Sequence, residues 1–98
     1  MAHHLIPLEA IQRHPSLMRR AARGGFDING LGNGVLLDPL DHVGRHPQYS
    51  RVVLEELGDI AADARRLNFS EAEIGRLVQG VAETLRKAND DGVFRPWF

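Results

Sequence analysis

The chain has 98 residues, 43% of them hydrophobic, and a formal net charge of −1. That length supports one domain with a modest core. The near-neutral charge argues against a protein that holds nucleic acid through a broad electropositive face. The chain has no cysteine, so disulfides, thiolate metal sites and cysteine nucleophiles are excluded. We expect neither a membrane span nor a signal peptide.

The N-terminal segment AHHLIP predicts a short β segment that is ended by Pro7. Its two histidines do not resemble a purification tag, which would run to about six histidines and a linker. Because this strand would have almost nothing before it, we expect the domain to be cut from a longer polypeptide with upstream domains.

The following segment, LEAIQRHPSLMRRAARGG, has a helical composition. Pro15 lies inside it and must break or restart the helix, and Gly24-Gly25 forms a stop signal, so we expect two short helices. The next residues, FDINGLGNG, are typical of tight turns and lead into VLLD, a short buried strand ended by Pro39.

From Pro47 onward the pattern is strongly helical, and proline suits the first position of a helix. Ser70 and Glu73 form a capping box that starts a second long helix. We expect the two long helices to be antiparallel neighbours. Their apolar residues recur at steps of three and four: Val53, Leu57, Ile60, Ala61, Ala64 and Leu67, then Ile74, Leu77, Val78, Val81 and Leu85.

Four of the five histidines fall in two groups, His3-His4 and His42-x-x-x-His46, while His14 stands alone. Neighbouring side chains in a strand point to opposite faces, so His3 and His4 suit two jobs, one as a metal ligand and one as a base. Imidazoles from separate segments can hold one divalent metal with positions left open for water and substrate. A free histidine with an ordinary pKa of about 6.5 can take a proton from water.

Each of these signals has a simpler alternative. The HxxxH spacing does not fit a regular helix, because Gly44 intervenes and the residue before Pro47 avoids helical geometry, so His46 would lie at the start of the helix instead. Asn29-Gly30 and Asn33-Gly34 are first of all turn signals. His14 is expected to have no functional role.

Arginines supply the candidate phosphate contacts. One cluster lies on the first two predicted helices and could bind phosphates or form an ordinary exposed face: Arg13, Arg19, Arg20 and Arg23. Arg45, between the two histidines of the second group, is the better candidate for contacting the scissile phosphate.

Three ordered motifs between Ala2 and Tyr49 resemble the AHH family of the HNH, or ββα-metal, nuclease superfamily. They are AHHLIP, GFDING…NGVLL and HVGRHPQY. The resemblance implies a mostly helical α+β fold with a ββα-metal core, a helical insertion and two long C-terminal helices. It implies a single domain over residues 1–98, with the core at about 2–60 and a helical extension at about 61–98.

The resemblance also implies roles for individual residues. His3 would be the metal ligand of the first strand and His4 the general base. Asn33 would orient the base or its loop. His46 and His42 would complete a site for one divalent ion, such as zinc, nickel or magnesium, and no organic cofactor is expected.

The implied function is a metal-dependent endonuclease, with DNA favoured over RNA, that serves as the C-terminal toxin domain of a bacterial polymorphic toxin. We expect a monomer that is delivered by a secretion system into a target-cell cytoplasm and is blocked by a cognate immunity protein. Two features depart from the family pattern: a helical insertion between the strands and the low net charge. The alternative is a non-enzymatic, zinc-stabilised helical module that presents a groove to a protein partner.

Overall fold

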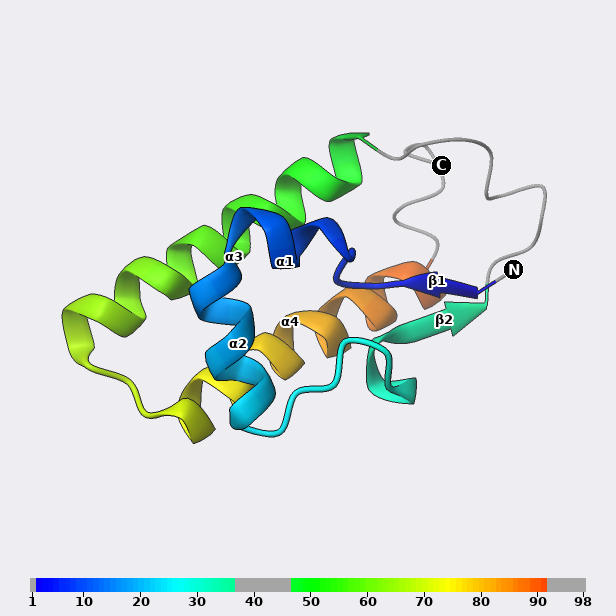
Figure 1. Cartoon of the computed structure of the whole chain (residues 1–98). Coiled ribbons are helices and arrows are strands. Elements are labelled where there is room, and N and C mark those ends of the chain that lie inside the picture. The colour runs from blue at the N-terminus through cyan, green and yellow to red at the C-terminus, as the bar shows by residue number, and fades with distance from the viewer. Residues whose placement is uncertain (1, 37–46, 92–98) are drawn as a thin grey trace.

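The computed structural model describes residues 2–36 and 47–91, and helices make up most of this part of the chain (Figure 1). The mostly helical class is therefore confirmed. The elements in chain order are β1 (Ala2–His4), α1 (Glu9–Arg13), α2 (Pro15–Arg23), the 3₁₀ turn η1 (Leu31–Asn33), β2 (Gly34–Leu36), α3 (Pro47–Leu67) and α4 (Glu71–Asp90).

The two short strands β1 and β2 pair in an antiparallel sheet, although residues 5–33 separate them in sequence. The register places His3 opposite Val35 and His4 opposite Gly34. The prediction that the first β segment continues to Pro7 is wrong, because the strand ends at His4 and the next residues turn toward α1. The second strand begins at Gly34, one residue earlier than predicted.

The predicted pair of short helices is confirmed as α1 and α2. His14 lies between them with φ −134° and ψ 63°, outside the helical region, and Pro15 takes the first position of α2. The clash between a proline ring and the preceding residue disfavours helical geometry at His14. Gly25, just after α2, has a φ of +106°, a conformation that glycine adopts without steric cost.

The two long helices α3 and α4 run in opposite directions, as predicted (Figure 1). Asn68 follows α3 with a φ of 56°, and the Phe69 N–H donates to the carbonyl of Ala64 at 3.1 Å, which is the Schellman ending of a helix. The predicted capping box then starts α4: the Ser70 Oγ accepts from the Glu73 N–H at 3.1 Å and donates to the Glu73 Oε1 at 3.1 Å.

The helix α1 packs on α3 and the helix α2 packs on α4, so both short helices form part of the core (Figure 1). The helical insertion is thus not an appendage, because its apolar side chains are buried in the same cluster as those of the long helices. The buried cluster consists of Ile6, Ala10, Leu17, Met18, Ala21, Phe26, Tyr49, Val53, Leu57, Ala64, Ile74, Val78 and Ala82.

The end of α2 touches the first turns of α4 without any side chain between the two backbones. A Cβ atom on Gly24 would lie 1.9 Å from the carbonyl oxygen of Glu71, and one on Gly75 would lie 2.5 Å from the carbonyl oxygen of Gly24. Both distances are far below van der Waals contact. Glycine is therefore required at both positions for α2 and α4 to approach this closely.

The strands and α3 follow one another in the order expected of a ββα core. Residues 37–46, which would join β2 to α3, lie outside the described residues. The ββα-metal core is therefore not confirmed, and α3 itself runs without a break past residue 60, where the core was expected to end.

Candidate functional site

His4 is the predicted base, and it is the last residue of β1. Its side chain is partly exposed, so water can reach the imidazole ring. The ring Nε2 lies 3.0 Å from the Oδ1 of Asn29, a residue 25 positions away in sequence. This distance is that of a normal hydrogen bond, so a side chain of the loop that precedes η1 holds the imidazole ring in place.

Asn33 is the most deeply buried polar residue near this site, with an exposed fraction of 0%. Its Oδ1 accepts from the N–H of Ile6 at 2.7 Å, and its Nδ2 donates to the carbonyls of Ile6 at 3.0 Å and Ile28 at 2.9 Å. Its own carbonyl accepts from the N–H of Leu5 at 2.7 Å. Asn33 therefore ties the backbone just after β1 to the backbone beside Asn29.

The loop that carries Asn29 is organised by Asp27. The Asp27 Oδ1 accepts from the backbone N–H of Asn29 at 3.0 Å, which is an Asx turn, and its carbonyl accepts from the N–H of Gly30 at 3.0 Å. The predicted turn at Asn29-Gly30 is thus confirmed. The contact between the Asn29 side chain and His4 could not be predicted, because a turn motif carries no information about contacts with a distant strand.

Two side chains from the long helices hold the strands in place. The hydroxyl of Tyr49, in the first turn of α3, donates to the carbonyl of Leu5, and Tyr49 is buried with an exposed fraction of 1%. Burial raises the pKa of this hydroxyl far above its ordinary value, so it stays a donor at any physiological pH. Arg86 of α4 donates to the carbonyl of Gly34, the residue opposite His4, at 2.7 Å.

Of the other predicted site residues, the structure describes only the backbone of His3. The backbone of His3 pairs with Val35 beside it in the sheet, whereas His42, Arg45 and His46 lie outside the described residues. Within residues 2–36 and 47–91, no group of three or more His, Asp or Glu side chains is close enough to hold a metal ion. The described residues alone therefore do not complete a metal site.

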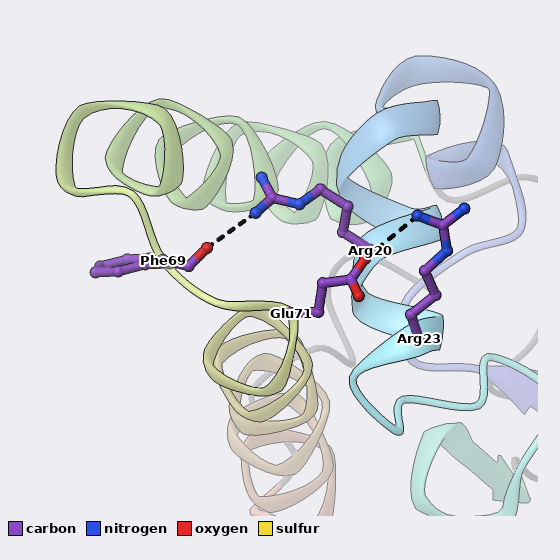
Figure 2. Close-up of polar contacts among 4 residues, drawn as sticks. All are labelled: Arg20, Arg23, Phe69 and Glu71. Atoms are coloured by element: carbon purple, nitrogen blue, oxygen red, sulfur yellow. Dashed lines mark hydrogen bonds and ion pairs between the residues drawn. The ribbon is translucent and has the colours of Figure 1, made fainter.

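Two of the four clustered arginines connect α2 to the α3–α4 turn (Figure 2). The Nη2 of Arg20 donates to the carbonyl of Phe69 at 2.9 Å, and the Nη1 of Arg23 lies 3.3 Å from the Oε2 of Glu71. Arg20 thus contacts the connection between α3 and α4, and Arg23 contacts the first residue of α4. Arg13 and Arg19 are exposed. The structure thus gives half of this cluster an intramolecular role.

His14, for which no functional role was expected, makes a contact inside the fold. Its Nε2 lies 3.0 Å from the carbonyl oxygen of Leu54 in the middle of α3, in a partly buried position. Because a carbonyl oxygen only accepts, the Nε2 of His14 carries a proton and links the α1–α2 break to α3. This is a structural contact between the two helical segments.

A nuclease domain of the HNH type is the class that these features fit: adjacent histidines on a short paired strand, with an asparagine just before the partner strand. The comparison with family models agrees. The AHH model, described as a nuclease family of the HNH/ENDO VII superfamily with conserved AHH, matches residues 1–85. The chain belongs to this family, and Ala2-His3-His4 is its AHH motif. Neither the curated proteins nor the solved structures give a significant match.

Family membership decides between the two functions that the sequence left open, because AHH is a family of enzymes. The non-enzymatic module would have used the surface between the long helices. An apolar groove of about 600 Å³ does lie between α3 and α4 among the described residues, lined in part by Val52, Ile60 and Leu77.

No helix in the described ranges is both long and apolar enough to cross a bilayer.

Proposed function

We propose that this nuclease is a metal-dependent endonuclease that hydrolyses phosphodiester bonds in DNA in preference to RNA, with His4 as its general base. The observation that carries the proposal is the position of His4. It belongs to the motif that defines a nuclease family, its ring is partly exposed, and its Nε2 lies 3.0 Å from the Oδ1 of Asn29.

The proposed metal ligands are His3, His42 and His46. Three imidazoles are a donor set that suits zinc or nickel. Magnesium is the alternative, although this hard cation prefers oxygen ligands. When bound, a divalent ion would polarise the phosphoryl oxygen and stabilise the charge of the leaving oxygen. The family match and the position of His3 next to His4 in β1 support this assignment.

The chain's own residues have three tasks in the proposed reaction. His4 accepts the proton of the attacking water on its unprotonated ring nitrogen. Arg45 contacts the scissile phosphate and offsets its charge. Asn33 keeps the backbone around His4 in place through its buried hydrogen bonds to Ile6 and Ile28, which is how a residue can serve the base without touching the substrate.

We also propose that the domain acts as a toxin in bacterial competition, delivered into the cytoplasm of a target cell as a monomer and blocked by a cognate immunity protein. The net charge of −1 gives little electrostatic steering. The association rate with that partner should therefore depend only weakly on ionic strength. Expression of the domain in a bacterial cytoplasm should arrest growth, and the same domain carrying His4→Gln should not.

The experiment that tests the activity uses the purified 98-residue chain with closed circular plasmid, linear DNA and total RNA. Each substrate is incubated with Mg²⁺, Ni²⁺ or Zn²⁺ and with a chelator. Nicking of the closed circle identifies an endonuclease, because that substrate has no ends. We expect metal-stimulated nicking that His4→Gln abolishes. Cleavage of RNA alone would overturn the DNA preference, and cleavage that survives His4→Gln would overturn the role of His4.

A further inference from the structure

The imidazole of His4 has a single side-chain partner within the described part of the chain, the amide of Asn29. The Nε2 of His4 lies 3.0 Å from the Oδ1 of Asn29. An amide oxygen can only accept a hydrogen bond, so the Nε2 of a neutral His4 must be the donor. The proton of the neutral ring is then on Nε2, and the lone pair available to a water molecule is on Nδ1.

We propose that Asn29 is a positioning residue that fixes the tautomer and the orientation of His4, so that Nδ1 is the nitrogen that takes the proton from the attacking water. Isolated imidazole exchanges its proton between two nitrogens, and only one tautomer presents the lone pair in the productive direction. A fixed hydrogen bond at Nε2 removes that choice. The role in catalysis rests on the proposed function of His4, whereas the fixed tautomer rests on the geometry alone.

The loop around Asn29 is built to hold this side chain in position. The Asx turn of Asp27 fixes the backbone of Asn29 on one side. On the other side, the neighbouring carbonyl of Ile28 accepts from the buried side chain of Asn33, which also bonds both backbone groups of Ile6. Asn29 itself is exposed, and its φ is not in the left-handed region. A turn alone would therefore accept other residues here, and the contact with His4 is the interaction that specifically uses an amide.

Two variants of matched size separate the acceptor oxygen from the rest of the side chain. Asn29→Leu keeps the shape and removes the acceptor, whereas Asn29→Asp keeps an acceptor oxygen in the same place. Each is made in the full chain and studied with Mg²⁺ present. Long-range ¹⁵N–¹H NMR spectra are recorded at about pH 8.5, two units above the ordinary histidine pKa of about 6.5. The signals of His4 are identified by their loss in His4→Gln.

The parent and Asn29→Asp should each show His4 as one tautomer, with the proton on Nε2. Asn29→Leu should show a mixture of both tautomers. In the cleavage assay, Asn29→Leu should lower kcat about 10- to 100-fold with little change in KM, as for other residues that orient a reactive side chain. Asn29→Asp should recover most of that loss.

A proton on Nδ1 in the parent, or an unchanged single tautomer in Asn29→Leu, would overturn the proposal. Equal loss of kcat in Asn29→Leu and Asn29→Asp would overturn the catalytic part of it. The NMR readout does not need turnover. If the parent domain cleaves no nucleic acid, the proposed function fails while the spectra still decide whether Asn29 fixes His4.

Discussion

Asn33 bonds both backbone groups of Ile6, accepting from its N–H at 2.7 Å and donating to its carbonyl at 3.0 Å. This pairing resembles a rung of a sheet in which a side-chain amide replaces one of the two strands. Asn33→Ala would leave the N–H and carbonyl of Ile6 buried and unpaired. We expect it to lower the free energy of unfolding by about 2–4 kcal/mol, measured by urea denaturation.

The control for this prediction is Asn29→Leu, because Asn29 is exposed and bonds to His4 instead of the core. It should leave the denaturation midpoint close to that of the parent. The two substitutions should therefore have different effects: Asn33→Ala should lower mainly stability, and Asn29→Leu should lower mainly the rate of cleavage. A small effect of Asn33→Ala on stability would mean that the amide is not the main link between residues 5–6 and residue 28.

Two glycines of α4 should respond in opposite ways to the same substitution. Gly75→Ala would place a Cβ 2.5 Å from the carbonyl oxygen of Gly24, a backbone atom that cannot move aside, whereas nothing lies within 4 Å of a Cβ at Gly80. We expect Gly75→Ala to destabilise the domain by about 1–3 kcal/mol through overpacking. Gly80→Ala should stabilise it by up to about 1 kcal/mol, since alanine is the better helix former.

Thermal unfolding of both variants checks this pair. Equal behaviour of Gly75→Ala and Gly80→Ala would contradict the close approach of α2 to α4.

Because the hydroxyl of Tyr49 is buried, we expect the free energy of unfolding to fall at alkaline pH. Burial raises the pKa of Tyr49 above the value of about 10 in the unfolded chain. The stabilising contribution is complete below about pH 10 and declines as the pH rises further, because the unfolded chain then loses its proton first. Tyr49 is the sole tyrosine, so the ultraviolet absorbance of tyrosinate reports on it alone.

Tyr49→Phe should remove this alkaline component of unfolding and, at neutral pH, cost about 1 kcal/mol for the lost hydrogen bond to Leu5. An ordinary tyrosine titration in the folded parent would show that the hydroxyl is not buried as described.

His14 should matter for stability and not for cleavage. Its Nε2 donates to the carbonyl of Leu54 at 3.0 Å across the core side of α3. His14→Ala should therefore lower the unfolding free energy by about 1 kcal/mol. Under conditions where the variant remains folded, plasmid nicking should match the parent. A loss of nicking without a loss of stability would place His14 in the reaction.

Local signals in the sequence predicted the helices well. Pro15 marked the break between α1 and α2, and the Ser70–Glu73 capping box marked the start of α4, because each acts on its own neighbours in the chain. The resemblance carried by the AHH motif predicted the family, which the match over residues 1–85 confirms.

Local sequence signals did not predict the long-range hydrogen bonds that shape the site. The bond between His4 and Asn29 spans 25 positions, and the bond between His14 and Leu54 spans 40. Each depends on how the helices pack, and no spacing rule indicates it. The same holds for Arg20, whose guanidinium group bonds the carbonyl of Phe69 and was expected to face solvent or phosphate.

The adjacent histidines of β1 provide the most direct test of the proposed mechanism, because the two identical side chains have different tasks. His3→Ala or His46→Ala should weaken metal binding, since each removes a coordinating nitrogen from a site with few ligands. Cleavage should fall in proportion to the metal that is lost and should recover in part when excess metal is added. His4→Ala should bind metal almost as the parent does, yet lose about 10²–10⁴-fold in rate because the water loses its base. Calorimetric metal titration beside plasmid nicking, near neutral pH, measures both quantities. If His4→Ala loses metal while His3→Ala keeps it, the two roles are exchanged, and if both variants cleave like the parent, neither histidine takes part in the reaction.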